Sequence, residues 1–217
     1  MTPQVLLILI LVIALAASFP MFYRTYLWNK FLKHLKNNNS EQALKILNST
    51  QYKVAFGKDS QNWNLLRFYI SRNDTKNAKA LTSELLGSSI SKQQAYRIFS
   101  NAYFYFLSNE DKEMSAKLLT RLEDILEDGQ KEQFNMLYRV LIEKKSEDIE
   151  RVNELLANME KEKESASKKS QVGLLQYLLG VQYYYQNNKK EAEKWLKKAK
   201  TNVKGSPLEK HIKKLIH

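Results

Sequence analysis

The stretch Leu178–Ala199, LLGVQYYYQNNKKEAEKWLKKA, contains the features that decide the fold of this chain. A glycine and three consecutive tyrosines lie in a segment of helical character, and a polar turn separates them from a second helical segment. Gly180 has no side chain and Ala192 has a small one, so two helices can approach closely at these positions. The stretch therefore predicts a helical hairpin whose two helices pack tightly.

The same arrangement recurs along the chain. Five short polar turns each follow an aromatic-rich segment and precede a charged one, and they read KNNNS, SRNDT, LSNED, EKKSE and QNNKK. The central positions of the charged segments are Ala43, Ala78, Met114, Ile149 and Ala192. The steps between these positions are 35, 36, 35 and 43 residues, and they predict five hairpins in a helical solenoid, followed by a C-terminal capping helix that begins at Pro207.

The composition agrees with an all-α fold. The 217 residues are 43% hydrophobic and 27% charged, which is enough to bury a core, and only six Gly and three Pro are present. An all-β chain needs many more tight turns than these residues allow. The absence of cysteine excludes disulfides and thiolate catalysis.

Local signals predict where the helices begin and end. Polar residues before charged segments predict the helix starts, and these are Ser40, Asp74, Ser91, Ser108, Ser146 and Ser206. Gly87 and Gly129 fall where helices are expected to stop. The alternation of Tyr52, Val54 and Phe56 suggests a packed loop between helices.

The first residues predict a membrane anchor. Val5–Phe19 contains no charged residue, and the apolar stretch extended through Phe22 is about 18 residues long, which is the lower limit for spanning a bilayer. Aromatic residues and then Arg24 and Lys30 follow it, which is typical of a membrane interface. We expect an anchor over residues 1–23, a repeat domain over residues 24–217, and a cytoplasmic body by the positive-inside rule. A cleaved signal peptide and an extracytoplasmic body are the alternatives.

The hairpin quoted first resembles a tetratricopeptide repeat (TPR). The residues that match the family's motif at its spacing are Leu179, Gly180, Tyr183, Ala192, Leu196 and Ala199. The proline expected at Lys204 is absent, and the glycine position is occupied by Phe31, Leu66, Ala102 and Leu137 in the other repeats. The specific match covers residues 173–204, and a related helical-hairpin family remains an alternative for the rest.

The resemblance implies a concave groove that binds a protein or peptide partner. The residues that it places in the groove are Trp63, Arg67, Phe99, Tyr103, Phe106, Phe134, Tyr138, Tyr177, Tyr184 and Tyr185. Aromatic side chains with polar tips suit such an interface. The alternative is that many of them, with Tyr183, form the core between helices.

No catalytic pattern accompanies the repeats. The histidines His34, His211 and His217 form no metal-ligand motif, and the glycines form no phosphate loop, so we expect no enzyme, cofactor or metal. Residues 108–164 carry 10 basic and 16 acidic residues, and this acidic centre argues against nucleic acid. The lysine-rich C-terminus is a polar cap or a contact for an anionic surface. We expect a membrane-anchored scaffold; a binding or chaperone-like module outside the cytoplasm is the alternative.

Overall fold

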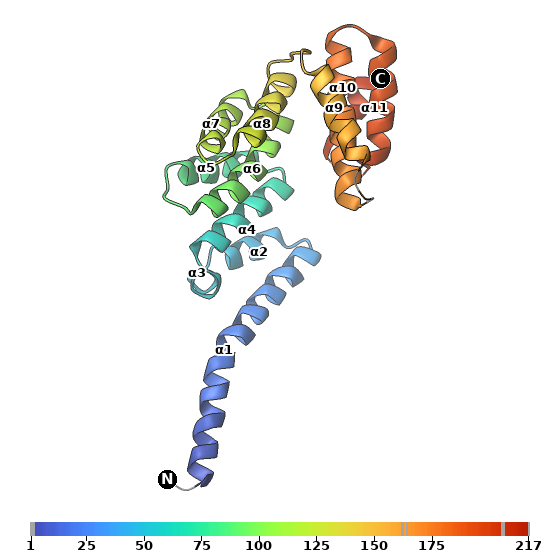
Figure 1. Cartoon of the computed structure of the whole chain (residues 1–217). Helices are drawn as coiled ribbons and strands as arrows, with labels where there is room; N and C mark the ends of the chain where they lie inside the picture. Colours follow the sequence, from blue (N-terminus) through green and yellow to red (C-terminus); the bar gives the residue numbers. More distant parts are fainter. Residues whose placement is uncertain (1–2, 162, 164, 205–206, 217) are drawn as a thin grey trace. The chain divides into compact units, whose positions relative to one another are not determined.

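The computed structural model shows a chain built of helices (Figure 1). It describes residues 3–161, 163, 165–204 and 207–216, without the side chains of residues 3, 5–12, 14–15, 160, 166, 207 and 210. Over these residues no strand is found, as the composition predicts. The helices are α1 (Pro3–Lys36), α2 (Ser40–Leu47), α3 (Thr50–Phe56), α4 (Lys58–Ser71), α5 (Thr75–Leu86), α6 (Lys92–Ser108), α7 (Lys112–Glu123), α8 (Asp128–Leu141), α9 (Ile149–Glu160), α10 (Ala166–Tyr185), α11 (Lys189–Asn202) and α12 (Pro207–Ile216).

The chain divides into two compact units, one of residues 1–98 and one of residues 99–217. The division falls inside α6, and each unit is described by itself below. The domain boundary predicted after Tyr23 lies inside α1, which continues through Pro20 to Lys36.

The five predicted hairpins are present as helix pairs, each joined by a turn with one residue of positive φ. These residues are Asn38, Asn73, Glu110, Lys144 and Asn187, with φ between 54° and 59°. In four turns the next residue donates its backbone N–H to the carbonyl five positions earlier; Asn188 donates to Tyr183 at 2.9 Å, for example. This left-handed cap satisfies carbonyl groups that the end of a helix leaves free.

The residue after the left-handed one caps the next helix. Asn39, Asp74, Asp111 and Asn188 each accept a hydrogen bond from the backbone N–H three residues on. Asp74 confirms the sequence prediction. Ser40 and Ser108 are wrong as caps, because the carboxylate or amide that follows the left-handed residue takes that role. The first turn of each second helix is thereby fixed by a short polar side chain.

The turn between α8 and α9 departs from this pattern. Its left-handed residue is Lys144, and three further residues precede the cap position, Asp148. The Asp148 carboxylate does not cap α9, because it accepts two hydrogen bonds from Arg139, from Nε at 3.0 Å and from Nη2 at 2.6 Å. The prediction that α9 starts directly after Ser146 is therefore wrong.

The cap positions correct the repeat register. The fourth residue after each cap is buried, and these residues are Ala43, Ala78, Ser115, Val152 and Ala192. The sequence spacing placed Met114 and Ile149 in this row, one and three positions before the residues that occupy it. The error arose because Met114 is also apolar and because the α8–α9 turn is longer than the others.

The hairpin of α10 and α11 is packed through glycine. A Cβ atom at Gly180 would lie 2.6 Å from Cγ of Leu196, and one at Gly173 would lie 2.6 Å from Cγ1 of Val203. Ala192 and Ala199 are buried on the facing helix. The close approach predicted at Gly180 is confirmed, and Gly173, seven residues earlier on the same face, extends it.

One loop prediction and one helix-end prediction in the rest of the chain are wrong. Residues 50–56 form helix α3, which Ser49 caps by accepting a hydrogen bond from the N–H of Tyr52. Tyr52 is fully buried and stacks on Phe56 with ring centroids 4.4 Å apart. Gly129 lies in the first turn of α8 instead of ending a helix, whereas Gly87 ends α5 as predicted.

Most of the predicted anchor, Val5–Phe19, lies outside the residues whose side chains are described. Across the described part of the chain, no helix combines the length and the apolar character that crossing a membrane requires.

Candidate functional site

The candidate site is a cleft of about 600 Å³ within the unit of residues 99–217. Four elements position it: the C-terminal half of α10, helix α12, the turn that follows α6, and the turn between α8 and α9. Its lining residues are Ser108, Asn109, Glu110, Lys144, Tyr177, Val181, Tyr184, Tyr185, His211, Lys214 and Leu215. We call it the tyrosine cleft.

One face of α10 supplies the aromatic wall. Tyr177, Val181, Tyr184 and Tyr185 follow one another at helical spacing, which brings them to the same side of the helix. Tyr177 and Val181 are buried, while Tyr184 is 47% exposed and lies edge to face with Tyr185 at 6.2 Å. The wall therefore has an apolar floor and an exposed aromatic rim.

The phenol groups of Tyr177 and Tyr185 stay protonated at neutral pH. Burial raises the pKa of Tyr177, and burial together with the nearby Glu110 carboxylate raises the pKa of Tyr185 to about 12. A protonated phenol can donate a hydrogen bond to a carboxylate or a carbonyl oxygen. The cleft therefore offers hydrogen-bond donors as well as apolar surface.

Charged side chains surround the opening. Lys144 forms an ion pair with Glu110, with Nζ 3.1 Å from Oε1, so these two charges offset each other. Lys214, which is exposed, and His211 come from α12. The arrangement suits an apolar or aromatic side chain between the tyrosines, with a carboxylate facing Lys214.

Three of the predicted groove residues, Tyr177, Tyr184 and Tyr185, come together in this cleft. Tyr183, predicted as core, is half-buried. Tyr138 is also half-buried and does not line the cleft.

Four predicted groove residues lie in the core. Phe99, Tyr103 and Phe106 are fully buried, and Phe134 is 7% exposed. The Tyr103 hydroxyl donates to the Phe134 carbonyl at 2.8 Å, and the two rings lie 5.3 Å apart. Their prediction as surface residues is wrong, because their side chains fill the space between helices. Phe104, which the sequence analysis did not select, is exposed beside them.

Trp63 and Arg67 form a separate cluster in the unit of residues 1–98. The Arg67 guanidinium lies 5.5 Å from the Trp63 ring centroid, and that of Arg97 lies 4.6 Å from it. Cation–π contacts of this kind hold both arginines against the ring. These two predicted residues are thus neighbours, in the other unit from the tyrosine cleft.

Sequence reasoning missed the residues that complete the cleft. His211 was considered only in the search for a metal-ligand motif, which it does not form, and Lys214 only as one lysine of the lysine-rich C-terminus. The apolar residues of α12 could have indicated this wall of the cleft. Ile212 and Leu215 lie three residues apart among lysines, a spacing that predicts an amphipathic helix packed against the preceding helices.

Among the side chains that the structure describes, no group of three or more His, Asp or Glu residues is arranged to hold a metal ion. No protein-family model, curated protein or solved structure matches this chain.

Proposed function

We propose that this protein is a membrane-anchored scaffold that holds an acidic segment of a protein partner in the tyrosine cleft, without catalysing a reaction. The proposal rests on one observation: a single cleft contains an exposed aromatic rim, phenol groups that can donate hydrogen bonds, and Lys214. Aromatic anchors flanked by charged groups are the usual centres of protein interfaces.

The repeated helix pairs support a binding role. Five pairs with buried positions at the same distance from each cap suit a solenoid of the TPR kind, which we propose as the fold family. Such repeats expose extended surfaces for partners. The proposal relies on the residues of the α10–α11 hairpin, where Gly180, Ala192 and Leu196 pack as the family's motif requires.

The anchor is proposed from the sequence. Val5–Phe19 lacks charged residues, and Arg24, Lys30, Lys33 and Lys36 follow it before the first acid, Glu41. Positive residues on this side of an apolar segment favour a cytoplasmic body. Resistance of the full chain to alkaline carbonate extraction tests the anchor, and protease access in intact cells tests the side.

Peptide binding tests the cleft. The full chain in a neutral detergent is titrated with two fluorescent peptides that each carry one Trp, flanked either by Asp or by Lys. We expect the Asp peptide to bind, and Tyr184→Ala or Lys214→Glu to weaken its binding about 10-fold or more. Lys213→Glu is the matched control, because Lys213 is an exposed neighbour that does not line the cleft.

Equal binding of the two peptides would contradict the charge preference. An affinity that Tyr184→Ala leaves unchanged would contradict the cleft itself. Turnover of a substrate by the purified chain would overturn the assignment as a scaffold.

A further inference from the structure

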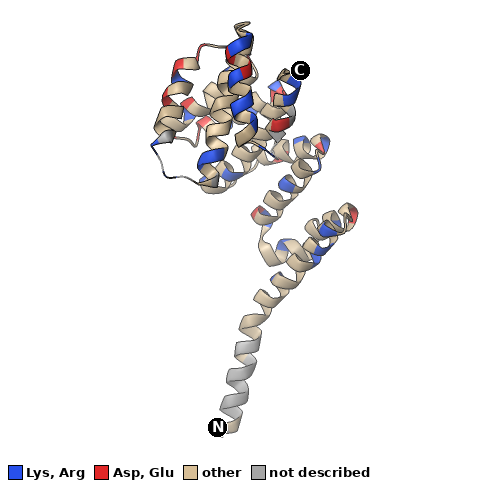
Figure 2. Ribbon diagram, turned by 90° about the vertical axis from the view of Figure 1, so that its right-hand side faces the viewer, with Lys and Arg blue, Asp and Glu red and all other residues tan. Residues whose placement is uncertain are grey.

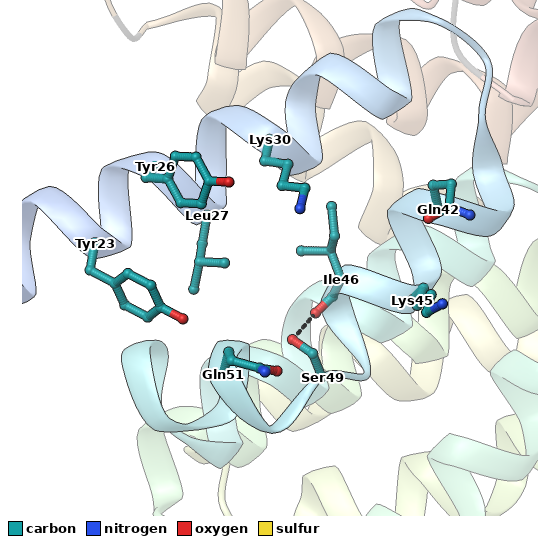
Figure 3. Close-up of a pocket in the computed structure, with 9 residues that line it drawn as sticks. All are labelled: Tyr23, Tyr26, Leu27, Lys30, Gln42, Lys45, Ile46, Ser49 and Gln51. Carbon is teal, nitrogen blue, oxygen red and sulfur yellow. Dashed lines mark hydrogen bonds between the residues drawn. The ribbon is translucent and has the colours of Figure 1, made fainter.

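A second cleft lies in the unit of residues 1–98, between α1 and the segment formed by α2 and the start of α3. Its volume is about 410 Å³. Figure 3 shows Tyr23 and Lys30 pointing from α1 toward the facing segment, where Ile46 and Gln51 lie. The lining residues are Tyr23, Tyr26, Leu27, Lys30, Gln42, Lys45, Ile46, Ser49 and Gln51. We call it the α1–α3 cleft.

The chemistry of this cleft suits an anion. Its lining includes two lysines, two tyrosines and two glutamines, and neither Asp nor Glu. Ser49 is already engaged, since its hydroxyl donates to the Ile46 carbonyl at 2.7 Å and accepts from Tyr52. The ammonium, phenol and amide groups are donors that a phosphate oxygen accepts.

The cleft is held open by contacts outside its lining. The Arg24 side chain donates from Nε to the Ala55 carbonyl and so joins α1 to α3. The Gln61 amide donates to the carbonyl of Leu47 at the end of α2, at 2.6 Å. The first contact joins the two sides of the cleft and the second ties the end of α2 to α4, so both sides have support that does not depend on a ligand.

Its position on α1 points to the membrane surface. Tyr23 and Lys30 follow the last residue of the apolar stretch, Phe22, by one and eight residues on one continuous helix. At 1.5 Å per residue these distances are about 1.5 Å and about 12 Å. The headgroup layer is roughly 5–7 Å thick, and side chains on a helix lean toward its N-terminus. Lys30 therefore reaches back toward the layer in which Tyr23 lies.

The surrounding charge favours an anionic surface. From residue 20 to residue 58 the only acid is Glu41, whereas the basic residues number seven. They are Arg24, Lys30, Lys33, Lys36, Lys45, Lys53 and Lys58. Figure 2 marks Lys and Arg in blue and shows them in the C-terminal part of α1 and the segment that follows it. Juxtamembrane lysines of this density attract anionic lipids.

We propose that the α1–α3 cleft binds the phosphate headgroup of an anionic phospholipid. This inference rests on the proposed membrane anchor, because only an inserted α1 brings the cleft to the headgroups. Carbonate extraction tests membrane anchoring independently of lipid binding. An error in the proposed cleft can therefore be distinguished from an error in the proposed anchor.

Native mass spectrometry of the full chain in neutral detergent tests the proposal. The probes are dioleoylphosphatidylglycerol and dioleoylphosphatidylcholine. We expect preferential retention of phosphatidylglycerol and a loss of affinity of about 10-fold or more in a Lys30→Gln, Lys45→Gln variant. Gln51→Lys should strengthen binding and Gln51→Glu should weaken it, since Gln51 is exposed and tolerates either change.

The matched control is Lys33→Gln with Lys53→Gln. Both lysines are exposed on α1 and α3 and do not line the cleft, and the variant loses the same charge. Equal losses in the two double variants would overturn the site in favour of general surface attraction. A competition experiment with inorganic phosphate tests the other possible occupant. If inorganic phosphate displaces the lipid at equal concentration, the occupant is a soluble phosphate and the lipid proposal is wrong.

Discussion

The backbone of Gly180 lies against Leu196, so that a Cβ atom added to the glycine would stand 2.6 Å from the leucine Cγ. The Leu196 backbone nitrogen is 3.1 Å from the same point, which leaves little room for the leucine to retreat. This contact sets the separation of α10 and α11. Helix α10 carries the aromatic wall of the tyrosine cleft, and α11 packs against α10 and supports it.

Gly180→Ala should destabilise the protein. Overpacking costs roughly 1–3 kcal/mol, and the higher helix propensity of alanine offsets up to about 1 kcal/mol of it. Urea unfolding followed by circular dichroism measures the change. Gly129→Ala is the control, because no atom lies within 4 Å of a Cβ atom at Gly129. A loss as large at Gly129 as at Gly180 would show that packing is not the cause.

The left-handed turns make a second prediction. Asn187→Ala should cost about 1 kcal/mol, because alanine is disfavoured at a φ of 59°. Asn187→Gly should cost less than Asn187→Ala, since glycine adopts this conformation freely. Thermal unfolding of the two variants decides the matter. Equal melting temperatures would contradict the role of the left-handed backbone.

The Arg139–Asp148 pair makes a third prediction. Asp148 is buried, and its backbone N–H donates to the Gln182 side chain on α10 at 2.9 Å. Arg139→Ala should destabilise by roughly 1–3 kcal/mol, because it leaves the buried Asp148 carboxylate without the guanidinium that donates two hydrogen bonds to it. Glu132→Gln is the control and should cost less than about 0.5 kcal/mol, as its carboxylate is exposed.

A double-variant cycle with Asp148→Asn isolates the pair. Arg139→Ala should cost much less when Asp148 is already neutral. Strict additivity of the two changes would show that the ion pair contributes nothing beyond its separate side chains.

Stability should fall at low pH in part through Asp74. The side chain and the backbone N–H of Asn77 donate to its carboxylate and lower its pKa. A pKa lower in the folded than in the unfolded state stabilises the fold above about pH 3.9, and this contribution is lost as pH falls through the folded value. Asp74→Asn keeps the cap but does not titrate.

The wild type should therefore lose stability relative to Asp74→Asn below about pH 4. The difference should be small, on the order of 0.5 kcal/mol, because Asp74 is at the surface and screened by solvent. Chemical denaturation at a series of pH values measures it. If the free energy of unfolding of the two proteins fell in parallel with pH, Asp74 would not contribute to the loss of stability in acid.

The helix pairs could be predicted because their turns are local in sequence. A left-handed asparagine followed by an Asx cap needs only neighbouring residues, and Asn187 with Asn188 shows both in order. The start of α9 was mispredicted because the carboxylate at the cap position, Asp148, bonds to the side chain of Arg139, nine residues earlier, instead of capping the helix. Helix α3 escaped prediction because seven residues are too few to show a period.

The groove could be predicted only in part. Tyr184 and Tyr103 are both aromatic and occupy first helices of hairpins, yet one is 47% exposed and the other fully buried. Which face of a helix reaches the surface depends on packing between hairpins, and the sequence pattern of one hairpin does not contain it. Lys214 enters the tyrosine cleft from α12, a helix far along the chain that no local motif connects to Tyr177.

Photocrosslinking in intact cells tests the central claim most directly. A benzophenone amino acid replaces Tyr184 in the full chain, and adducts are identified in the membrane fraction. We expect one protein adduct that Lys214→Glu abolishes, that Lys213→Glu retains, and that does not form from Glu193, which is exposed on α11. The same adduct from Glu193, or one that Lys214→Glu leaves unchanged, would contradict the tyrosine cleft as the site that holds a partner.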